Sequence, residues 1–219
     1  MSSVVREQRS VNGFDRVALM GVGDVIVTQG DQEAVEVEAR SDILPHIKTE
    51  VQDSTLMIHF TREWTEWLGR MFDGIGPIKL YVTMKKVAGL RLSGAGRVRS
   101  ARLQADQLDL SLTGAGQLAV DDVTANHLNA ELSSVGSIEV GGKAETLRVR
   151  LSGAGSFQGG SLLSQTATVN LSGVGSATIW AADALDAQVS GAGTIEYFGS
   201  PRLNQRVSGL GKVRSLGVK

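Results

Sequence analysis

Residues 92–98 read Leu92-Ser93-Gly94-Ala95-Gly96-Arg97-Val98, and this phrase returns six more times with small changes. The second glycine of the copies stands at Gly96, Gly116, Gly136, Gly155, Gly175, Gly193 and Gly211. Successive copies are therefore 20, 20, 19, 20, 18 and 18 residues apart. An earlier phrase, residues 19–25, resembles a divergent eighth copy. A repeat with this short period is typical of a solenoid.

Each copy alternates apolar and polar side chains, as a β-strand with one buried face does. A unit of 18–20 residues built from short strands cannot bury its apolar face alone, so it has to stack on its neighbours. The repeat therefore predicts an all-β fold, a single parallel β-helix (β-solenoid) with coils of 18–20 residues.

The repeated glycine is expected at a corner of each coil, where the backbone needs a positive φ or has no room for a Cβ atom. Stacking also predicts three interior ladders, which begin at Leu92, Ala95 and Val98. If the middle ladder is interior, Ala115→Leu should overpack the corner and cost about 1–3 kcal/mol. This ladder holds Ala95, Ala115, Val135, Ala154, Val174, Ala192 and Leu210.

Two regions of one continuous domain can be distinguished. Residues 1–88 are expected to form irregular N-terminal coils and an aromatic-rich cap, and residues 89–219 the regular repeat solenoid. The cap would cover the N-terminal edge of the solenoid, which is otherwise a row of unpaired backbone groups. Strand-like runs in this region fall at 24–29, 34–39, 55–60 and 78–84.

The segment 61–74 carries the most information about partners. Its apolar residues recur at the spacing of an amphipathic helix, which predicts a short capping helix near 62–73. Two interpretations remain open: a cap that packs its rings over the solenoid, or an exposed anchor for a carbohydrate, a subunit or a membrane surface. The candidate ligand or partner contacts are Trp64, Trp67, Met71 and Phe72.

The 219 residues carry a net charge of -1, with 21% charged residues and no cysteine. Balanced charge argues against a nucleic-acid partner, which needs a basic face. No run is apolar and long enough for a transmembrane segment. We expect a periplasmic, cell-surface or secreted protein if a signal segment has been removed, and a cytoplasmic one if Met1 is the native start.

The residues predict no catalytic site, cofactor or metal. The histidines lack the spacing of paired metal ligands, and the Gly-Ala-Gly phrases are not a dinucleotide fingerprint. A β-helical polysaccharide enzyme would need clustered acids on successive coils, and the outward column from Arg97 to Lys212 holds none. The residues weighed and set aside are His46, His59, His127, Asp106, Asp109, Asp121 and Asp122.

A column of hydroxyls is present in all seven copies. It could bind a polymer or ordered water, but we favour hydroxyls that bond the corner backbone or the next coil. The column consists of Ser93, Thr113, Ser133, Ser152, Ser172, Ser190 and Ser208.

The repeated phrase at this spacing resembles the head GIN domain family of bacterial auto-transporter adhesins. The opening is also similar to that family, in residues 14–17, 21–30 and 35–38. The resemblance runs from about residue 10 to residue 217. It implies a parallel β-helical fold and a secreted or envelope-anchored location, and it brings no active-site motif with it.

The leading hypothesis is a non-enzymatic adhesion or surface-binding module of the cell envelope or of a secreted protein. Its ligand would be a surface polymer, a glycan or a protein. One alternative is a structural or self-assembling envelope scaffold, in which the chain forms a homo-oligomer. A carbohydrate-active enzyme is the third.

Overall fold

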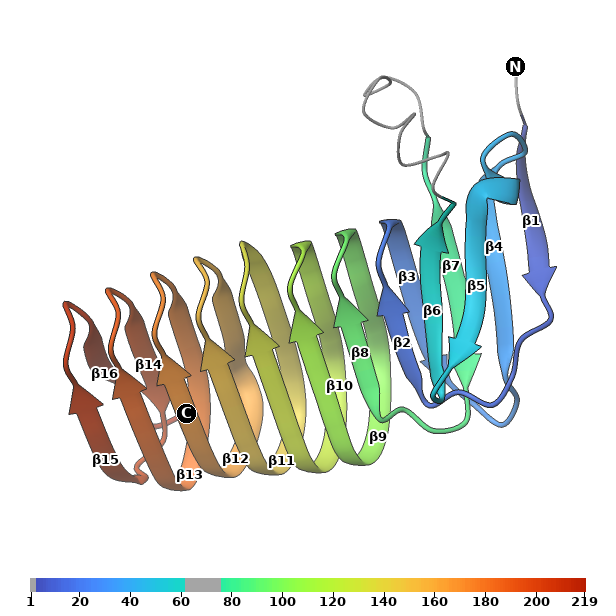
Figure 1. Ribbon diagram of the computed structural model, residues 1–219. Coiled ribbons are helices and arrows are strands. Elements are labelled where there is room, and N and C mark those ends of the chain that lie inside the picture. Colours follow the sequence, from blue (N-terminus) through green and yellow to red (C-terminus); the bar gives the residue numbers. More distant parts are fainter. Residues whose placement is uncertain (1–2, 62–75) are drawn as a thin grey trace.

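The computed structural model describes residues 3–61 and 76–219 and confirms an all-β solenoid (Figure 1). Its coils stack along one axis, with the two chain ends at opposite ends of the stack. The described residues contain no α-helix, only the 3-10 turn η1 (Leu44–His46), and none of their helical structure could cross a membrane. The helix expected near 62–73 lies outside the described residues.

Long parallel strands form the regular coils, and each bends across two faces of the solenoid. The start of such a strand lies on the first face, with β3 (Val22–Gln29) and β7 (Lys79–Met84). Its end lies on the second face, with β2 (Arg16–Leu19), β6 (Thr55–Phe60) and β8 (Gly89–Leu92). Further along, β14 and β16 continue the first face and β15 the second. Their bounds are β9 (Ala95–Leu112), β10 (Ala115–Leu132), β11 (Gly136–Leu151), β12 (Ser156–Leu171), β13 (Ser176–Val189), β14 (Thr194–Phe198), β15 (Arg202–Val207) and β16 (Lys212–Gly217).

The divergent copy at residues 19–25 forms the corner of the first coil, where β2 (Arg16–Leu19) leads into β3 (Val22–Gln29). Gly23 lies opposite Gly96 in the parallel ladder, although the two are 73 residues apart in sequence. The strand β8 (Gly89–Leu92) then pairs with both β2 and β9. The eighth copy is therefore confirmed by its position beside the first regular repeat.

The N-terminal end of the stack combines parallel and antiparallel pairs. The strands β6 and β7 continue the parallel ladders beside β2 and β3, and the pairs beyond them are antiparallel. On the first face, β1 pairs with β4, and β4 pairs with β7. On the second face, β5 and β6 form a hairpin. The runs expected at 24–29, 34–39, 55–60 and 78–84 correspond to β3, β4, β6 and β7, with bounds β1 (Val4–Arg9), β4 (Ala34–Arg40), β5 (Ile47–Gln52), β6 (Thr55–Phe60) and β7 (Lys79–Met84).

Two of the three expected ladders form the core. The columns that begin at Leu92 and Val98 are buried through Val189 and Ile195, and only their last members approach the open C-terminal end. Each buried aliphatic side chain contributes roughly 1.5–3 kcal/mol, so these columns account for much of the stability of the fold.

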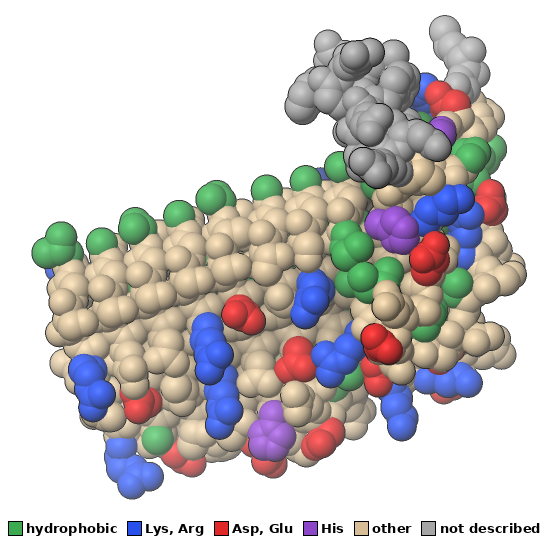
Figure 2. Space-filling view, in the orientation of Figure 1, with side chains coloured by type: hydrophobic (Ala, Val, Ile, Leu, Met, Phe, Trp, Pro, Cys, Tyr) green, Lys and Arg blue, Asp and Glu red, His purple; other side chains and the backbone are tan. Residues whose placement is uncertain are grey.

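The expectation of an interior small-residue ladder is wrong. Val135, Val174 and Leu210 of this column are 67%, 66% and 89% exposed. Figure 2 shows apolar side chains in a row along one edge of the solenoid. Counted by twos from Leu92, which faces the core, Ser93 and Ala95 both fall on the outward side, so strict strand alternation agrees with this exposure. The residue between the two glycines is consequently at the apex and points away from the core.

The glycines are needed because neighbouring coils approach each other closely at the corner. A Cβ atom at Gly114 would meet the backbone of Ser93 and Gly94, and one at Gly116 would meet the backbone of Gly96. The approach is held by a backbone hydrogen bond from Ala115 N to Gly94 O, 2.9 Å long. Gly116 also has a φ of +151°, which other residues rarely adopt.

This geometry predicts different effects on stability for substitutions at two adjacent residues. We expect Gly114→Ala to lower the free energy of unfolding by about 1–3 kcal/mol, since the new methyl group must displace backbone. Ala115→Leu adds a larger side chain at the exposed apex and should change it by no more than about 0.5 kcal/mol. Urea denaturation of both variants checks this, and a larger loss for Ala115→Leu would contradict the corner geometry.

Candidate functional site

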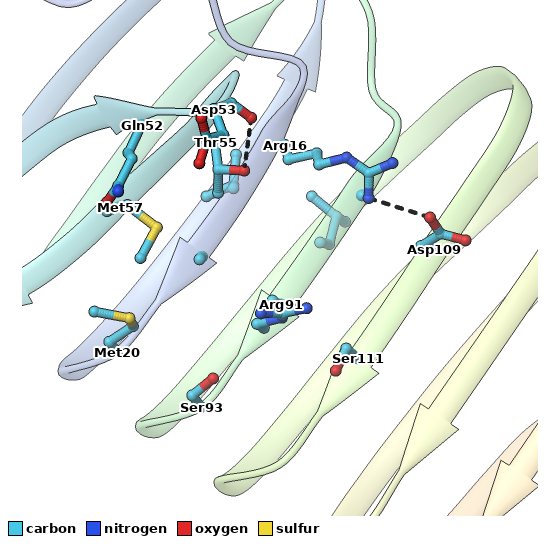
Figure 3. A pocket seen from close by; sticks show the side chains of 14 residues that line it. Arg16, Met20, Gln52, Asp53, Thr55, Met57, Arg91, Ser93, Asp109 and Ser111 are labelled. Atoms are coloured by element: carbon cyan, nitrogen blue, oxygen red, sulfur yellow. Dashed lines mark hydrogen bonds and ion pairs between the residues drawn. The ribbon is translucent and has the colours of Figure 1, made fainter.

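A hollow of about 350 Å³ lies on the outer surface of the second face, where the first coil meets the N-terminal cap (Figure 3). The neighbouring strands β6, β2, β8 and the end of β9 carry most of it. The side chains that surround it are Arg16, Met20, Gln52, Asp53, Thr55, Met57, Arg91, Ser93, Asp109 and Ser111.

Small residues at two adjacent outward positions form the floor of the hollow. Gly89 stands between Arg16 and Asp109 in one row across the strands. In the next row, Ala18 stands between Met57 and Arg91 and is 3% exposed. Longer side chains therefore surround the two positions instead of filling them.

The tip of the β5–β6 hairpin forms one end of the rim. Asp53 and Ser54 both have a positive φ, 48° and 58°, as a tight hairpin turn requires. The carbonyl oxygen of Ser54 accepts hydrogen bonds from the backbone N–H groups of Asp15 (2.9 Å) and Arg16 (3.2 Å). The turn is thus fixed to the start of β2, and Gln52 and Asp53 lie beside the hollow.

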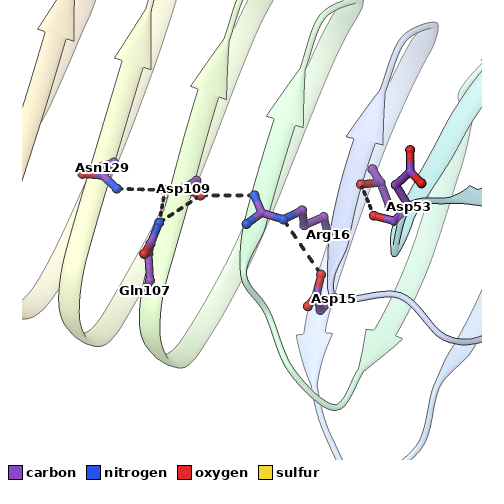
Figure 4. A network of polar contacts seen from close by, with 7 residues as sticks. Asp15, Arg16, Asp53, Gln107, Asp109 and Asn129 are labelled. Atoms are coloured by element: carbon purple, nitrogen blue, oxygen red, sulfur yellow. Dashed lines mark hydrogen bonds and ion pairs between the residues drawn. The ribbon is translucent and has the colours of Figure 1, made fainter.

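A charged network crosses the floor (Figure 4). Because Gly89 has no side chain, the Arg16 guanidinium reaches over β8 and donates a hydrogen bond to Asp109 Oδ2 at 3.1 Å. The Asp109 carboxylate also accepts hydrogen bonds from Asn129 (2.9 Å) and Gln107 (3.2 Å). On its other side, Arg16 Nε lies 3.9 Å from Asp15 Oδ1. The network joins the first coil to the regular solenoid.

The same contacts set the ionisation of Asp109. Partial burial raises the pKa of this carboxyl group, but the hydrogen bonds from Asn129, Gln107 and Arg16 together outweigh burial and hold the pKa below its ordinary value. The pair with Arg16 is about one-third exposed on the carboxylate side, so solvent screens it and its net contribution to stability is modest.

Arg91 differs from Arg16 in having no charged partner. Within residues 3–61 and 76–219, its guanidinium forms no ion pair and no side-chain hydrogen bond. Its neighbours across the strands are Ala18 and Ser111, neither of which carries charge. The hollow therefore offers one free guanidinium, hydroxyl groups and two methionine side chains, which can bind a ligand that has both an anionic group and an apolar face.

The other candidate residues in the described part of the chain do not line the hollow, apart from Asp109 and Ser93 of the hydroxyl column. Trp64, Trp67, Met71 and Phe72 lie outside the described residues, so their contacts stay a prediction.

The hydroxyl column is exposed along its whole length. Of its members, Ser172 alone bonds protein in the described part of the chain, through a weak 3.4 Å contact to Leu151 O. The favoured role for the other six hydroxyls is therefore wrong.

The acids and histidines set aside earlier are also located. Asp109, set aside from the sequence as a catalytic acid, is the acceptor of the network just described. His127 Nδ1 lies 2.7 Å from Thr146 Oγ1, while His59 Nδ1 is buried without a hydrogen-bond partner. Over the described ranges, no group of three or more potential ligands comes together around a metal position.

Sequence reasoning did not find the hollow, but a signal for it exists. Leu19 and Leu92 are equivalent positions of two copies, and three residues before them stand Arg16 and Gly89. The equivalent residue before Leu112 is Asp109. Extending the alignment of the repeats three positions toward the N-terminus thus places Arg16, Gly89 and Asp109 in one row. In that row a cation and an anion flank a residue that has no side chain.

The family of the chain follows from a match along most of its length. The family model described as "Putative auto-transporter adhesin, head GIN domain" matches residues 13–201. The chain belongs to this family. The matched part of this GIN-domain protein includes every residue that lines the hollow. No match was found among curated proteins.

Solved structures similar to this GIN-domain protein share its fold. A putative adhesin from Bacteroides fragilis is 24% identical, with a TM-score of 0.89 over 98% of this chain and 97% of that one. A putative lipid binding protein from Parabacteroides distasonis is 20% identical, with a TM-score of 0.76 over 97% and 96%. A putative adhesin from the latter species is 22% identical, with a TM-score of 0.75 over 98% of each chain.

The pKa of Asp109 generates a test of the network. Because the folded-state pKa is depressed, the stabilisation is present above the unfolded pKa, near 3.9, and is lost as pH falls through the folded pKa. We expect Asp109→Asn to cost about 1 kcal/mol or less at pH 7 and to weaken the loss of stability between pH 5 and pH 2. Urea unfolding at these pH values measures both effects.

Asp121→Asn is the matched control, since Asp121 has no bonded partner within the described residues. Its effect on the free energy of unfolding reports the removal of a carboxylate that lies outside the network. The role of the network would be contradicted if Asp109→Asn and Asp121→Asn gave the same profile.

Proposed function

We propose that this GIN-domain protein is a non-enzymatic adhesion module that binds a surface polymer, a glycan or a protein at the cell envelope or outside the cell. The observation that carries the proposal is the family match over residues 13–201. The related adhesin structures support the fold on which such a module is built.

The architecture supplies what a binding module needs. Backbone hydrogen bonds link each coil to the next along the whole stack, so side chains on the outer faces are held at fixed spacings. A site on strands is positioned more accurately than one on loops. The hollow around Arg91 and the segment with Trp64 and Trp67 are the two regions that we propose for contact with a ligand.

The location that fits this function is the periplasm, the cell surface or the extracellular medium. In each of these compartments a solenoid of this kind would meet envelope polymers, glycans of other cells or surface proteins. This part of the proposal rests on the family and predicts that the protein is recovered from the envelope or secreted fraction of the cells that make it.

The first experiment is binding of the purified protein to a panel of glycans, envelope polymers and surface proteins, beside the variant with Trp64→Ala and Trp67→Ala. We expect saturable binding to one class of polymer and a loss of that binding in the variant, because clustered tryptophans suit such contacts. The variant must keep its melting temperature and circular dichroism spectrum. Absence of binding by the unmodified protein across polymers and surface proteins would overturn the adhesion proposal.

A second candidate function, a self-assembling scaffold, is favoured by the C-terminal end of the stack. The strands β15 and β16 are the last strands of the two faces, and each pairs on one side only. Leu203 and Val207, which face the interior, are 39% and 43% exposed there. Unpaired strand edges with apolar residues are templates for association with another chain.

Sedimentation velocity over a hundredfold range of protein concentration distinguishes the scaffold from the adhesion module. A scaffold that associates through this end predicts a mass that rises with concentration, and Leu203→Asp should abolish the rise. A monomer at every concentration would remove this candidate and leave the adhesion module.

A further inference from the structure

We propose that the hollow around Arg91 binds a carboxylated sugar residue of a polysaccharide. This inference rests on the proposed adhesion function and names its ligand class. Its starting point is the difference between the two arginines that line the hollow. Arg16 is paired with Asp109, whereas Arg91 has no acidic partner in the described part of the chain.

The Arg91 guanidinium is suited to a carboxylate. Its planar fork donates two parallel hydrogen bonds to the two oxygens of such a group, an arrangement that is stronger than a bond between neutral groups. The other charges around the hollow do not occupy this fork. Asp109 is held by Arg16, Asn129 and Gln107, and Asp53 stands at the hairpin end of the rim.

The remaining walls fit the other parts of a sugar ring. Met57 and Met20 lie on one side of Arg91, and Ala18 forms the floor between them. These apolar groups can pack against the C–H face of a pyranose ring. Gln52, Ser93 and Ser111 stand around this surface with side chains that donate and accept hydrogen bonds, as the hydroxyl groups of a sugar require.

The size of the hollow favours a single sugar ring over two other anionic ligands, one with a long acyl chain and a free phosphate. Its volume of about 350 Å³ is at the lower limit for a small-molecule site, which suits one ring rather than a long acyl chain. A free phosphate would satisfy Arg91 but leave the methionine surface uncovered. The hollow opens onto the surface, so the rest of a polymer can continue beyond the bound residue.

The fold also offers a path for that polymer. Met20 and Ser93 line the hollow in the outward row that continues along the solenoid as the exposed hydroxyl column, beginning with Thr113 and Ser133. No charged residue interrupts this column. Sugar units that follow the carboxylated residue along the solenoid would therefore meet hydroxyl groups at the spacing of the strands, about 4.8 Å.

The strongest competing site for an acidic polymer is the C-terminal coil. Residues 197–219 contain five basic residues and no acidic one. Such a surface attracts any polyanion by charge alone, without selecting a carboxylate or a sugar, and the attraction weakens steeply with salt. The experiment must separate binding at Arg91 from binding at this coil, for which Arg206 is a suitable probe.

The test uses polygalacturonate, hyaluronate and polysialic acid, each beside its carboxyl-reduced form, in which a neutral CH₂OH group replaces the carboxylate. Binding of the full chain is measured by biolayer interferometry at 0.15 M salt. We expect at least one acidic polymer to bind and its reduced form to bind about tenfold more weakly or not at all. Arg91→Gln should lose about the same factor, and Arg91→Lys should recover only part of it because Lys lacks the planar fork.

Arg150→Gln is the matched control, because Arg150 is an exposed arginine of the same outward row as Arg91, three coils further along. It should bind as the unmodified protein does. Arg91 is exposed, so Arg91→Gln should also keep the melting temperature, and a fall would be detected by circular dichroism. Met57→Lys, which fills the apolar wall with a second cation, should weaken sugar binding although it adds positive charge.

The results separate this inference from the adhesion proposal. Binding that Arg206→Gln abolishes and Arg91→Gln leaves unchanged would overturn the hollow as the site. Equal binding of acidic and reduced polymers would overturn the carboxylate while leaving an adhesion module in place. Absence of binding to all three acidic polymers would overturn the inference, and the adhesion proposal would then depend on the wider panel of polymers and proteins.

Discussion

The rest of the structure depends on the close approach of successive coils at the Gly-x-Gly corner. Backbone of one coil occupies the space in which a Cβ atom of the next would stand, so each coil has one permitted position relative to its neighbour. Hydrogen bonds such as Ala115 N to Gly94 O then fix the register. Once the corner is in register, Leu92 and Val98 and their equivalents fall into continuous buried columns, and the hydrophobic core follows.

A fixed register has a second effect, on the outer surface. Since equivalent residues stand side by side, any position at which a copy departs from the repeat becomes a local feature of the face. Gly89 and Ala18 are such departures, and together they open the hollow on the second face. Gly89 also allows Arg16 to reach Asp109 across an intervening strand. The regular repeat therefore fixes the positions of the strands, and the residues that depart from it form the hollow and the charged network.

Features that depend on contacts between neighbouring repeats can be predicted from the sequence, whereas features that depend on contacts between distant, non-repeated segments cannot. The solenoid and two of its ladders are encoded in every repeat, so period and alternation are sufficient to predict them. Apolar character alone places the Ala95 column wrongly, since counting by twos from Leu92 puts Ala95 on the outward side. The antiparallel strands β1 and β5 lack a repeat to compare with, and their pairing depends on contacts with β4 and β6. The pair formed by Arg16 and Asp109 spans 93 residues and needs the gap at Gly89.

The position of Arg91 shows why a free charge in a concave site is more informative than one on a flat surface. Arg150 occupies the same outward row, and a ligand bound there would remain largely in water, where an ion pair contributes little. A ring seated between Met57 and Met20 would instead remove water from one side of the Arg91 guanidinium. The attraction between the fork and a carboxylate strengthens as water leaves, while the apolar contact offsets part of the desolvation. Binding in the hollow thus requires both halves of the ligand, the acid and the ring, which is a basis for selecting an acidic sugar over a simple anion.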